Sequence, residues 1–407
     1  LVRTMDPAMP VAEAFAVENG EFVAVGRNDD IVNLAHGSRG AGRVETMDLH
    51  GLTVLPGFID GHTHVMWVGE GLDRVDLTGC RSIEELKSRV RRRASELGPG
   101  QWVVGFGWHQ ERFAEKRDPL AADIDAVANS LAMRMAGVSA ETADPIGGKV
   151  VRDAQGNPVG LLHETAMQLV AGILPVPDER EKRSILRRAM LEMLKMGITS
   201  VHAIDFSCEA AYRGLHSAGE LPLRVYMDQP VSTMEEIEGL SEPTGAGDDR
   251  LRVGSVKFWA DGAFGPRTAA VREPYADDPG NTGLLVYGPG ELENLAVAAA
   301  RRGRQVTIHA LGDRAMDVAM DALERVAASA PRGCGAGPMA AAGRRDRVVH
   351  CGLTDPALVS RMRALGAVAD LQPCFIPHEV HWMPGRVGPG RWGRMYAFKS
   401  LVDAGIC

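Results

Sequence analysis

Apolar strand-like segments alternate with helix-like segments along most of this 407-residue chain, and no other feature constrains the fold as strongly. Seven segments have the length and residue types of buried strands: 54–59, 199–203, 223–227, 255–259, 306–310, 347–351 and 367–371. Amphipathic stretches with helical spacing lie between them, for example 181–196, 290–302 and 313–327. This alternation predicts an α/β fold with a parallel sheet, a (β/α)8 TIM-type barrel whose eighth strand begins only at 406–407.

Two further parts of the chain do not follow this alternation. Residues 1–54 contain a strand, an Asn-Gly turn and a second strand at 14–26, and a further short strand is expected at 44–49. They predict the N-terminal part of a small flanking β-sandwich module, and residues 55–407 form the barrel. The interval at about 66–185 is too long for one loop. It holds its own predicted helix (83–97), strand (102–107) and β-arm (147–162), which indicates an insertion over the barrel mouth, a lid or substrate wall.

The first predicted strand ends in two histidines, His62 and His64. Alternate residues of a strand point to the same side, so both imidazoles can aim at one point. A bare His-x-His pair is more often an ordinary surface or core feature. The apolar strand before the pair, interrupted by Pro56 and Gly57, favours a site for a divalent metal ion instead.

Two more histidines occupy equivalent places. His309 and His350 lie near the ends of the fifth and sixth predicted strands, and barrel active sites are built at the carboxyl ends of strands. Each alone would be read as a core histidine bonded to backbone; together with the first pair they predict metal ligands. Lys257 lies within an apolar strand, where burial lowers the pKa of an ammonium. A neutral amine can take up carbon dioxide as a carbamate that bridges two metals; the alternative is an ion pair with a carboxylate such as Asp261.

Composition restricts the partners. The net charge is −8 without a basic stripe, which disfavours nucleic acid, and no apolar run of about 18 residues predicts a membrane span. The six cysteines are scattered without CxxC spacing, as in a cytoplasmic protein with reduced thiols. We therefore expect a cytoplasmic protein that acts on a small-molecule substrate. The sequence leaves open whether the protein forms a homo-oligomer.

Several motifs resemble one known family. Residues 55–64, Leu-Pro-Gly-Phe-Ile-Asp-Gly-His-Thr-His, are similar to the signature of the amidohydrolase superfamily of metal-dependent hydrolases. Residues 256–269 resemble the KxxxDGxxGxRTA block of amidohydrolase family 3, the YtcJ-like branch, which includes N-substituted formamide deformylases. Residues 160–166, 308–315 and 347–351 follow the same pattern, so the resemblance covers nearly the whole chain in order.

This resemblance implies a β-sandwich module beside a barrel that holds one or two divalent metal ions, with zinc expected. The ligands it implies are His62, His64, His309, His350 and a carboxylated Lys257. It further implies cleavage of a non-peptide C–N bond, of an amide or formamide, by a metal-activated water, with His350 polarising the carbonyl. The alternatives are a cyclic-amide hydrolase or a deaminase of the same superfamily, or a non-catalytic metal-binding barrel protein.

The chain departs from the family pattern at two places. The general-base Asp, in a Gly-Ser-Asp context after the eighth strand, is expected beyond Cys407, and an Asp-Gly-His segment of the family is lacking near Ala128. Candidates for the substrate pocket are Trp108, Asp261, Arg267, Arg314 and Gln372. The alternatives are lid packing for Trp108, a place behind the metal ligands for Asp261 and Arg267, and a local ion pair for Arg314.

Overall fold

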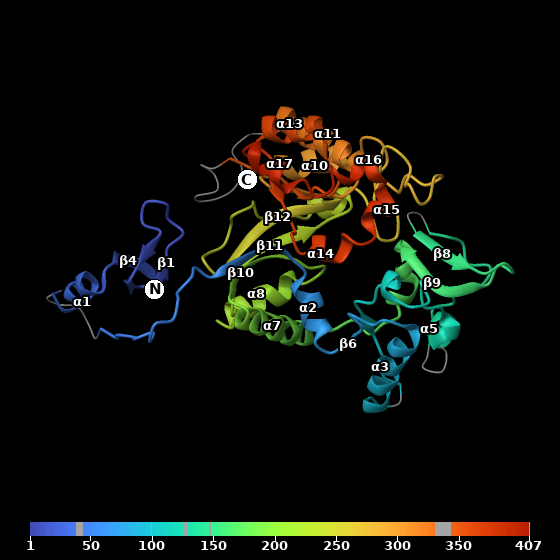
Figure 1. Ribbon diagram of the computed structural model, residues 1–407, viewed down its shortest axis with the longest axis horizontal. Coiled ribbons are helices and arrows are strands. Elements are labelled where there is room, and N and C mark those ends of the chain that lie inside the picture. Colours follow the sequence, from blue (N-terminus) through green and yellow to red (C-terminus); the bar gives the residue numbers. More distant parts are fainter. Residues whose placement is uncertain (38–43, 99, 125–128, 146–147, 330–342, 407) are drawn as a thin grey trace.

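The computed structural model describes residues 1–407 except 38–43, 99, 125–128, 146–147, 330–342 and 407 (Figure 1). Its centre is one parallel sheet of seven strands in the order β15-β14-β13-β12-β11-β10-β5. The strands are β5 (Phe58–Thr63), β10 (Ile198–Ile204), β11 (Arg224–Pro230), β12 (Leu251–Trp259), β13 (Val306–Ala310), β14 (Arg347–His350) and β15 (Val368–Asp370). The strand order follows the sequence, as a barrel requires.

The two ends of this sheet face each other. Arg347 of β14 bonds to the carbonyl oxygen of Gly61 in β5 at 3.4 Å, and Asp370 of β15 lies 3.7 Å from His62 of β5. The sheet is therefore a nearly closed TIM-like barrel, as predicted. The eighth strand stays a prediction, because residue 406 belongs to no strand and residue 407 lies outside the described part of the chain.

The first strand begins later than its sequence predicts. The apolar pattern indicates 54–59, but β5 runs from Phe58 to Thr63. Pro56 has no backbone N–H to give to a ladder, and Gly57 passes so close to β10 that a Cβ there would stand 2.2 Å from Thr199 Oγ1. The shift places His62 inside the strand and His64 directly after it.

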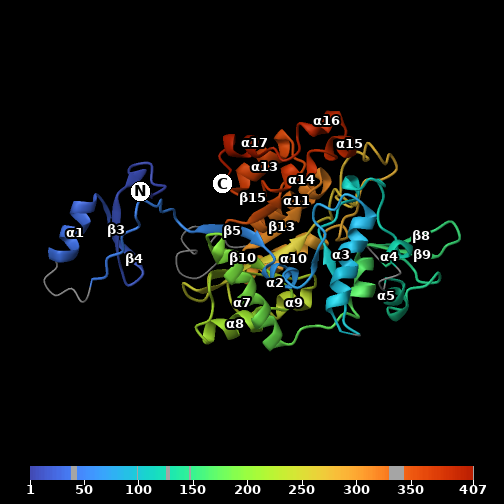
Figure 2. The same cartoon turned by 60° about the horizontal axis from the view of Figure 1, so that its bottom comes forward.

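Helices cover the outside of the barrel on two sides (Figures 1 and 2). On one side α2 (Val65–Gly71), α7 (Glu179–Lys195) and α8 (Glu209–Ser217) pack against β10 and β11 in one core cluster. On the other side α10 (Glu291–Arg301), α11 (Asp313–Ser329), α13 (Pro356–Leu365) and α17 (Phe398–Asp403) form a second cluster with β12, β13 and β14. The predicted helices at 181–196, 290–302 and 313–327 are α7, α10 and α11, each within about two residues of the expected bounds.

Residues 72–178 form a separate body beside the barrel (Figure 2). Its strands are the parallel pair β6 (Val75–Asp76) and β7 (Gly105–Phe106) and the hairpin β8 (Gly148–Arg152) and β9 (Pro158–Glu164). Its helices are α3 (Ile83–Glu96), α4 (Ala121–Ile124), α5 (Asn129–Met135), α6 (Gln168–Ala171) and the short 3-10 turns Gln110–Arg112 and Thr165–Met167. Two small clusters of buried apolar residues hold it together. The predicted gap near Ala128 falls outside the described residues.

The N-terminal residues lie to one side of the barrel (Figure 1). They form β1 (Val2–Arg3) with β2 (Val11–Ala12), the hairpin β3 (Ala14–Glu18) with β4 (Glu21–Gly26), and α1 (Asn28–Gly37). Asn19 and Gly20 have φ values of 52° and 84°, as the two central residues of a type I′ hairpin turn require. The strand predicted at 44–49 is wrong, because these residues form no ladder with any strand of the described part of the chain. The flanking β-sandwich stays a prediction.

In the part of the chain that the structure describes, each helix is too short or too polar to span a membrane. Cys80, Cys208, Cys351 and Cys374 are free thiols. The cytoplasmic location stays a prediction.

Candidate metal centre

The four histidines selected from the sequence meet at the carboxyl ends of three strands. His62 lies near the end of β5, His64 follows it, His309 lies near the end of β13, and His350 is the last residue of β14. The ring centroids of His62 and His64 are 5.6 Å apart, those of His62 and His350 5.2 Å, and those of His309 and His350 4.7 Å. His350 thus stands between the other rings.

Each of these histidines turns one ring nitrogen toward an oxygen of the protein. The pairs are His64 Nδ1 with Ile204 O at 2.5 Å, His350 Nδ1 with Gln372 Oε1 at 2.5 Å, His309 Nε2 with Gly262 O at 2.9 Å, and His62 Nδ1 with Asp370 Oδ2 at 3.7 Å. Metal-binding histidines show this arrangement, because the oxygen fixes the tautomer and leaves the other ring nitrogen for the ion.

The end of β10 holds His64 and the start of α2 together. Ile204 bonds to the His64 ring, and the next residue, Asp205, accepts a hydrogen bond from the backbone N–H of Met66 at 2.9 Å. The Tyr212 hydroxyl donates to the other Asp205 oxygen at 2.7 Å. The turn from β5 into α2 is therefore fixed from the neighbouring strand, and the direction of His64 with it.

Burial keeps three of these imidazoles neutral, those of His62, His64 and His350. It lowers the pKa of His62 to about 2, with the nearby Lys257 as the next cause, and it lowers the pKa of His64 and His350 in the same way. A neutral imidazole is the form that donates its lone pair to a metal. The backbone also marks this place: His350 and Cys351 have φ values of 74° and 47°, which non-glycine residues seldom adopt.

Lys257 lies inside the barrel and has no exposed surface. Burial, followed by the nearby guanidinium of Arg347, lowers the pKa of Lys257 to about 7. Its Nζ has no hydrogen-bond partner among the described residues and lies 5.4 Å from the centre of the Trp259 ring. The alternative ion pair with Asp261 is therefore not formed.

Three buried polar atoms lack a hydrogen bond at this centre: His62 Nδ1, Lys257 Nζ and Asp370 Oδ2. Leaving such atoms unpaired costs free energy, so a missing group that satisfies them is a physical expectation. The donor set, neutral imidazoles with a neutral amine and a carboxylate, fits a divalent cation. Among the described residues no three His, Cys, Asp or Glu side chains already stand at metal-binding spacing.

Asp261 supports His309 from behind. Its carboxylate accepts hydrogen bonds from the backbone N–H groups of Leu311 (3.0 Å), Gly312 (2.8 Å) and Ala270 (2.9 Å), and lies 3.3 Å from His309 Nε2. It is only 2% exposed. These contacts favour the alternative, a place behind His309, and the assignment of Asp261 to the substrate pocket stays a prediction.

Gly312 allows the loop after β13 to pass the loop after β12. A Cβ at this position would stand 1.8 Å from the carbonyl oxygen of Ala270. We expect Gly312→Ala to lower the free energy of unfolding by about 1–3 kcal/mol, because the two loops must separate. Chemical denaturation would measure this. Gly265→Ala is the matched control, since nothing lies within 4 Å of its Cβ, and equal losses in the two variants would contradict the expectation.

Comparison with known proteins agrees with this geometry. Residues 45–407 match the sequence model of the amidohydrolase family. The chain therefore belongs to the amidohydrolase family. It is 30% identical to YtcJ of Bacillus subtilis (strain 168), a protein named as an amidohydrolase, over 97% of this chain and 75% of that protein. It is 28% identical to the N-substituted formamide deformylase of Arthrobacter pascens, over 80% of this chain and 64% of that enzyme.

A solved structure shows the same fold. The crystal structure of an uncharacterized metal-dependent hydrolase from Pyrococcus horikoshii OT3 matches 96% of this chain and 76% of its own, with a TM-score of 0.73 and 27% identity. The predicted membership of amidohydrolase family 3 is confirmed, and the chain is a hydrolase of the amidohydrolase superfamily.

The structure places only some of the predicted pocket residues of this amidohydrolase next to the histidine cluster. Gln372 lies at the centre, where it bonds to His350 and donates to Asp370 Oδ1 at 3.1 Å. Trp108 stacks on Phe113 within the 72–178 body, with ring centroids 6.2 Å apart, which favours the alternative of lid packing.

The two predicted pocket arginines lie elsewhere. Arg267 forms a two-pronged ion pair with Asp277, with distances of 3.1 and 2.8 Å. Arg314 is exposed at the start of α11. Neither makes a described contact with the four histidines, so their assignment to the pocket is not supported by the positions of their side chains.

Sequence reasoning missed the residue that connects the strands of this amidohydrolase. Arg347 of β14 is buried at the centre of the barrel and contacts every other strand of the sheet. Its partners are Thr307 Oγ1 of β13 (2.9 Å), Ser255 Oγ of β12 (3.3 Å), Asp228 of β11, His202 of β10, Gly61 O of β5 (3.4 Å) and Asp370 Oδ2 of β15 (3.6 Å). The one sequence feature that points to Arg347 is the presence of a charged residue at the start of an apolar strand.

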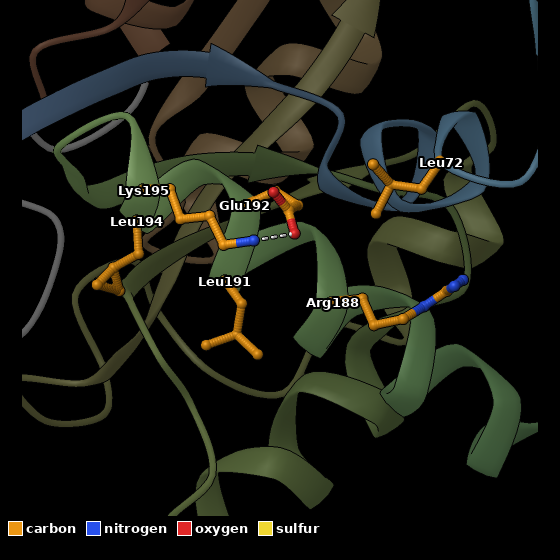
Figure 3. Close-up of a pocket in the computed structure, with 6 residues that line it drawn as sticks. All are labelled: Leu72, Arg188, Leu191, Glu192, Leu194 and Lys195. Carbon is orange, nitrogen blue, oxygen red and sulfur yellow. Dashed lines mark hydrogen bonds and ion pairs between the residues drawn. The ribbon is translucent and has the colours of Figure 1, made fainter.

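A shallow hollow on the outside of the molecule is separate from this centre. It is lined by Leu72, Arg188, Leu191, Glu192, Leu194 and Lys195 (Figure 3). Five of these residues lie on α7, and the lining includes no histidine. The hollow therefore lacks the chemistry that the barrel ends provide.

Proposed function

We propose that this amidohydrolase is a metal-dependent hydrolase that cleaves a non-peptide C–N bond of a small-molecule amide, with N-substituted formamides as the preferred class. One observation carries the proposal. The buried His350 and three partly buried histidines meet at the strand ends, and each has one ring nitrogen directed at a protein oxygen, with the unpaired Lys257 among them. The formamide deformylase of Arthrobacter pascens and the metal-dependent hydrolase of Pyrococcus horikoshii OT3 support the substrate class and the metal, respectively.

The residues that would hold one or two zinc ions are His62, His64, His309, His350 and Lys257. A bound ion supplies Lewis acidity, which lowers the pKa of a water and polarises a carbonyl oxygen. The protein's own part is to keep His62, His64 and His350 neutral by burial, to fix ring tautomers through Ile204, Gly262 and Gln372, and to hold the rings at one end of the barrel. The general base that the family pattern places beyond Cys407 stays a prediction.

Lys257 is proposed to act in its carboxylated form. The neutral amine attacks the carbon of carbon dioxide, an N–C bond forms, and one proton leaves to solvent, so the product is a carbamate anion with two oxygens. Two observations support this. The Nζ has no protein partner, and the lowered pKa leaves a large neutral fraction near pH 7. The anion would also satisfy the positive charge that two metal ions bring into a buried site.

The experiment that tests the proposed function combines elemental analysis with a substrate panel. We expect the purified protein, with the residues predicted beyond Cys407, to contain zinc and to hydrolyse N-formyl amines, to lose both zinc and activity on chelation, and to regain them with added zinc and bicarbonate. Turnover of hydantoins or aminopurines in place of formamides would support the cyclic-amide hydrolase or deaminase alternative. Zinc without any turnover would support the non-catalytic alternative, and a chain without zinc affinity would contradict the proposal.

A further inference from the structure

Asp370 is a buried carboxylate that no part of the proposed reaction yet uses. It is the last residue of β15, and its side chain is 9% exposed. One carboxylate oxygen, Oδ2, has no hydrogen-bond partner in the described chain. The same oxygen lies 3.7 Å from His62 Nδ1 and 3.6 Å from an Arg347 guanidinium nitrogen.

His62 is the one histidine of the four whose oxygen contact is not yet a hydrogen bond. The other three have ring nitrogens within 2.5–2.9 Å of an oxygen. His62 Nδ1 is buried and unpaired, and it faces an unpaired acceptor. A movement of less than about 1 Å would bring the two atoms to the 2.7–3.2 Å of an N–H···O hydrogen bond. A donor and an acceptor that are both buried and both unpaired are each stabilised by that movement.

The other side of Asp370 connects it to a second histidine. Its Oδ1 accepts a hydrogen bond from Gln372 Nε2 at 3.1 Å, and Gln372 Oε1 lies 2.5 Å from His350 Nδ1. Asp370 and Gln372 are two residues apart, so they project to the same side of the chain. Through Oδ2 the end of β15 thus faces His62 of β5. Through Oδ1 and Gln372 it is connected to His350 of β14.

We propose that Asp370 is the positioning residue of His62: its Oδ2 accepts the Nδ1–H, which fixes the tautomer whose Nε2 faces the metal centre. The inference rests on the proposed function, because it assigns His62 to that centre. An Arg347 guanidinium nitrogen lies 3.6 Å from the same oxygen and balances its charge. Carboxylates that accept from metal-binding imidazoles orient the ring and increase its basicity.

The test measures zinc affinity of the 407-residue chain by competition with a chromogenic chelator. We expect Asp370→Ala to weaken zinc binding by about 10- to 100-fold, the usual loss for such a partner. Asp370→Asn should lose less than about 10-fold, because its amide oxygen still accepts the Nδ1–H. In a His62→Ala background, Asp370→Ala should have no further effect, since the residue acts through His62. If Asp370→Ala fails to fold, Asp370→Ser takes its place in the cycle.

Each outcome of this test distinguishes a positioning role of Asp370 from another role. An equal loss in the Asn and Ala variants would show that the carboxylate charge itself is needed, as for a direct zinc ligand or a counterion of Lys257, and would overturn the inference. An undiminished effect in the His62→Ala background would also overturn it, as would full zinc affinity in Asp370→Ala. Asp403→Ala, an exposed carboxylate in a surface ion pair, is the matched control. A wild-type chain that binds no zinc would overturn the proposed function and this inference together.

Discussion

Replacing His350 with alanine is expected to weaken zinc binding by more than about 100-fold and to lower hydrolysis by at least about 1,000-fold. His350 is the middle ring of the cluster, 5.2 Å from His62 and 4.7 Å from His309 between ring centroids. Its loss removes a proposed ligand and also the neighbour that the other two rings contact. Elemental analysis of the purified variant and steady-state hydrolysis of an N-formyl amine would measure the two effects.

Two features of the structure make this effect specific. The His350 ring is stacked on Phe375, with centroids 5.4 Å apart, and Gln372 fixes its orientation. The control is His216→Ala, which removes a partly exposed histidine paired with Asp248. It should leave zinc content and rate unchanged. A His350→Ala variant that keeps wild-type zinc content and rate would contradict the assignment of this residue to the centre.

The four histidines of the candidate metal centre could be predicted from the sequence because each is marked by the residues next to it. Each lies at or near the end of an apolar strand, and the parallel order of the strands places all ends of one kind at the same rim. Lys257 was readable for the same reason, since a charged residue within an apolar strand is a local anomaly. The bounds of β5 were not, because they depend on how closely Gly57 approaches Thr199, a contact between strands.

Residues that act across the barrel could not be predicted in this way. Asp370 lies within the predicted strand 367–371, but its partner His62 belongs to the first strand, and no local pattern connects the two. Asp261 appeared to be a pocket residue because it follows the Lys257 strand. Three backbone N–H groups surround it instead, one from its own loop and two from the loop after β13. Such roles depend on which loops contact one another in the folded chain. The periodicity of the sequence carries no information on those contacts.

Arg347→Met is expected to lower the free energy of unfolding by about 3–5 kcal/mol, because it leaves a buried charge without its partner. Asp228 is 1% exposed, and it is paired with Arg347. Burial alone would raise the pKa of Asp228, yet the guanidinium of Arg347 is the main cause that holds it below its ordinary value. Methionine keeps much of the volume of arginine and removes the charge and all its hydrogen bonds. Denaturant unfolding followed by tryptophan fluorescence would measure the change.

A surface arginine with two carboxylate partners provides the matched control. Arg272 is paired with Asp317 and Asp355 at 2.5 Å each, but these groups are partly exposed, and Arg272→Met should cost at most about 1 kcal/mol. Adding Asp228→Asn to Arg347→Met should cost much less than Asp228→Asn alone, because the charge that lacks a partner is already gone. Additive losses in this cycle, or equal losses for Arg347 and Arg272, would show that Arg347 acts only through its volume. The expected coupling instead makes one guanidinium the electrostatic connection between the strands that carry the metal centre.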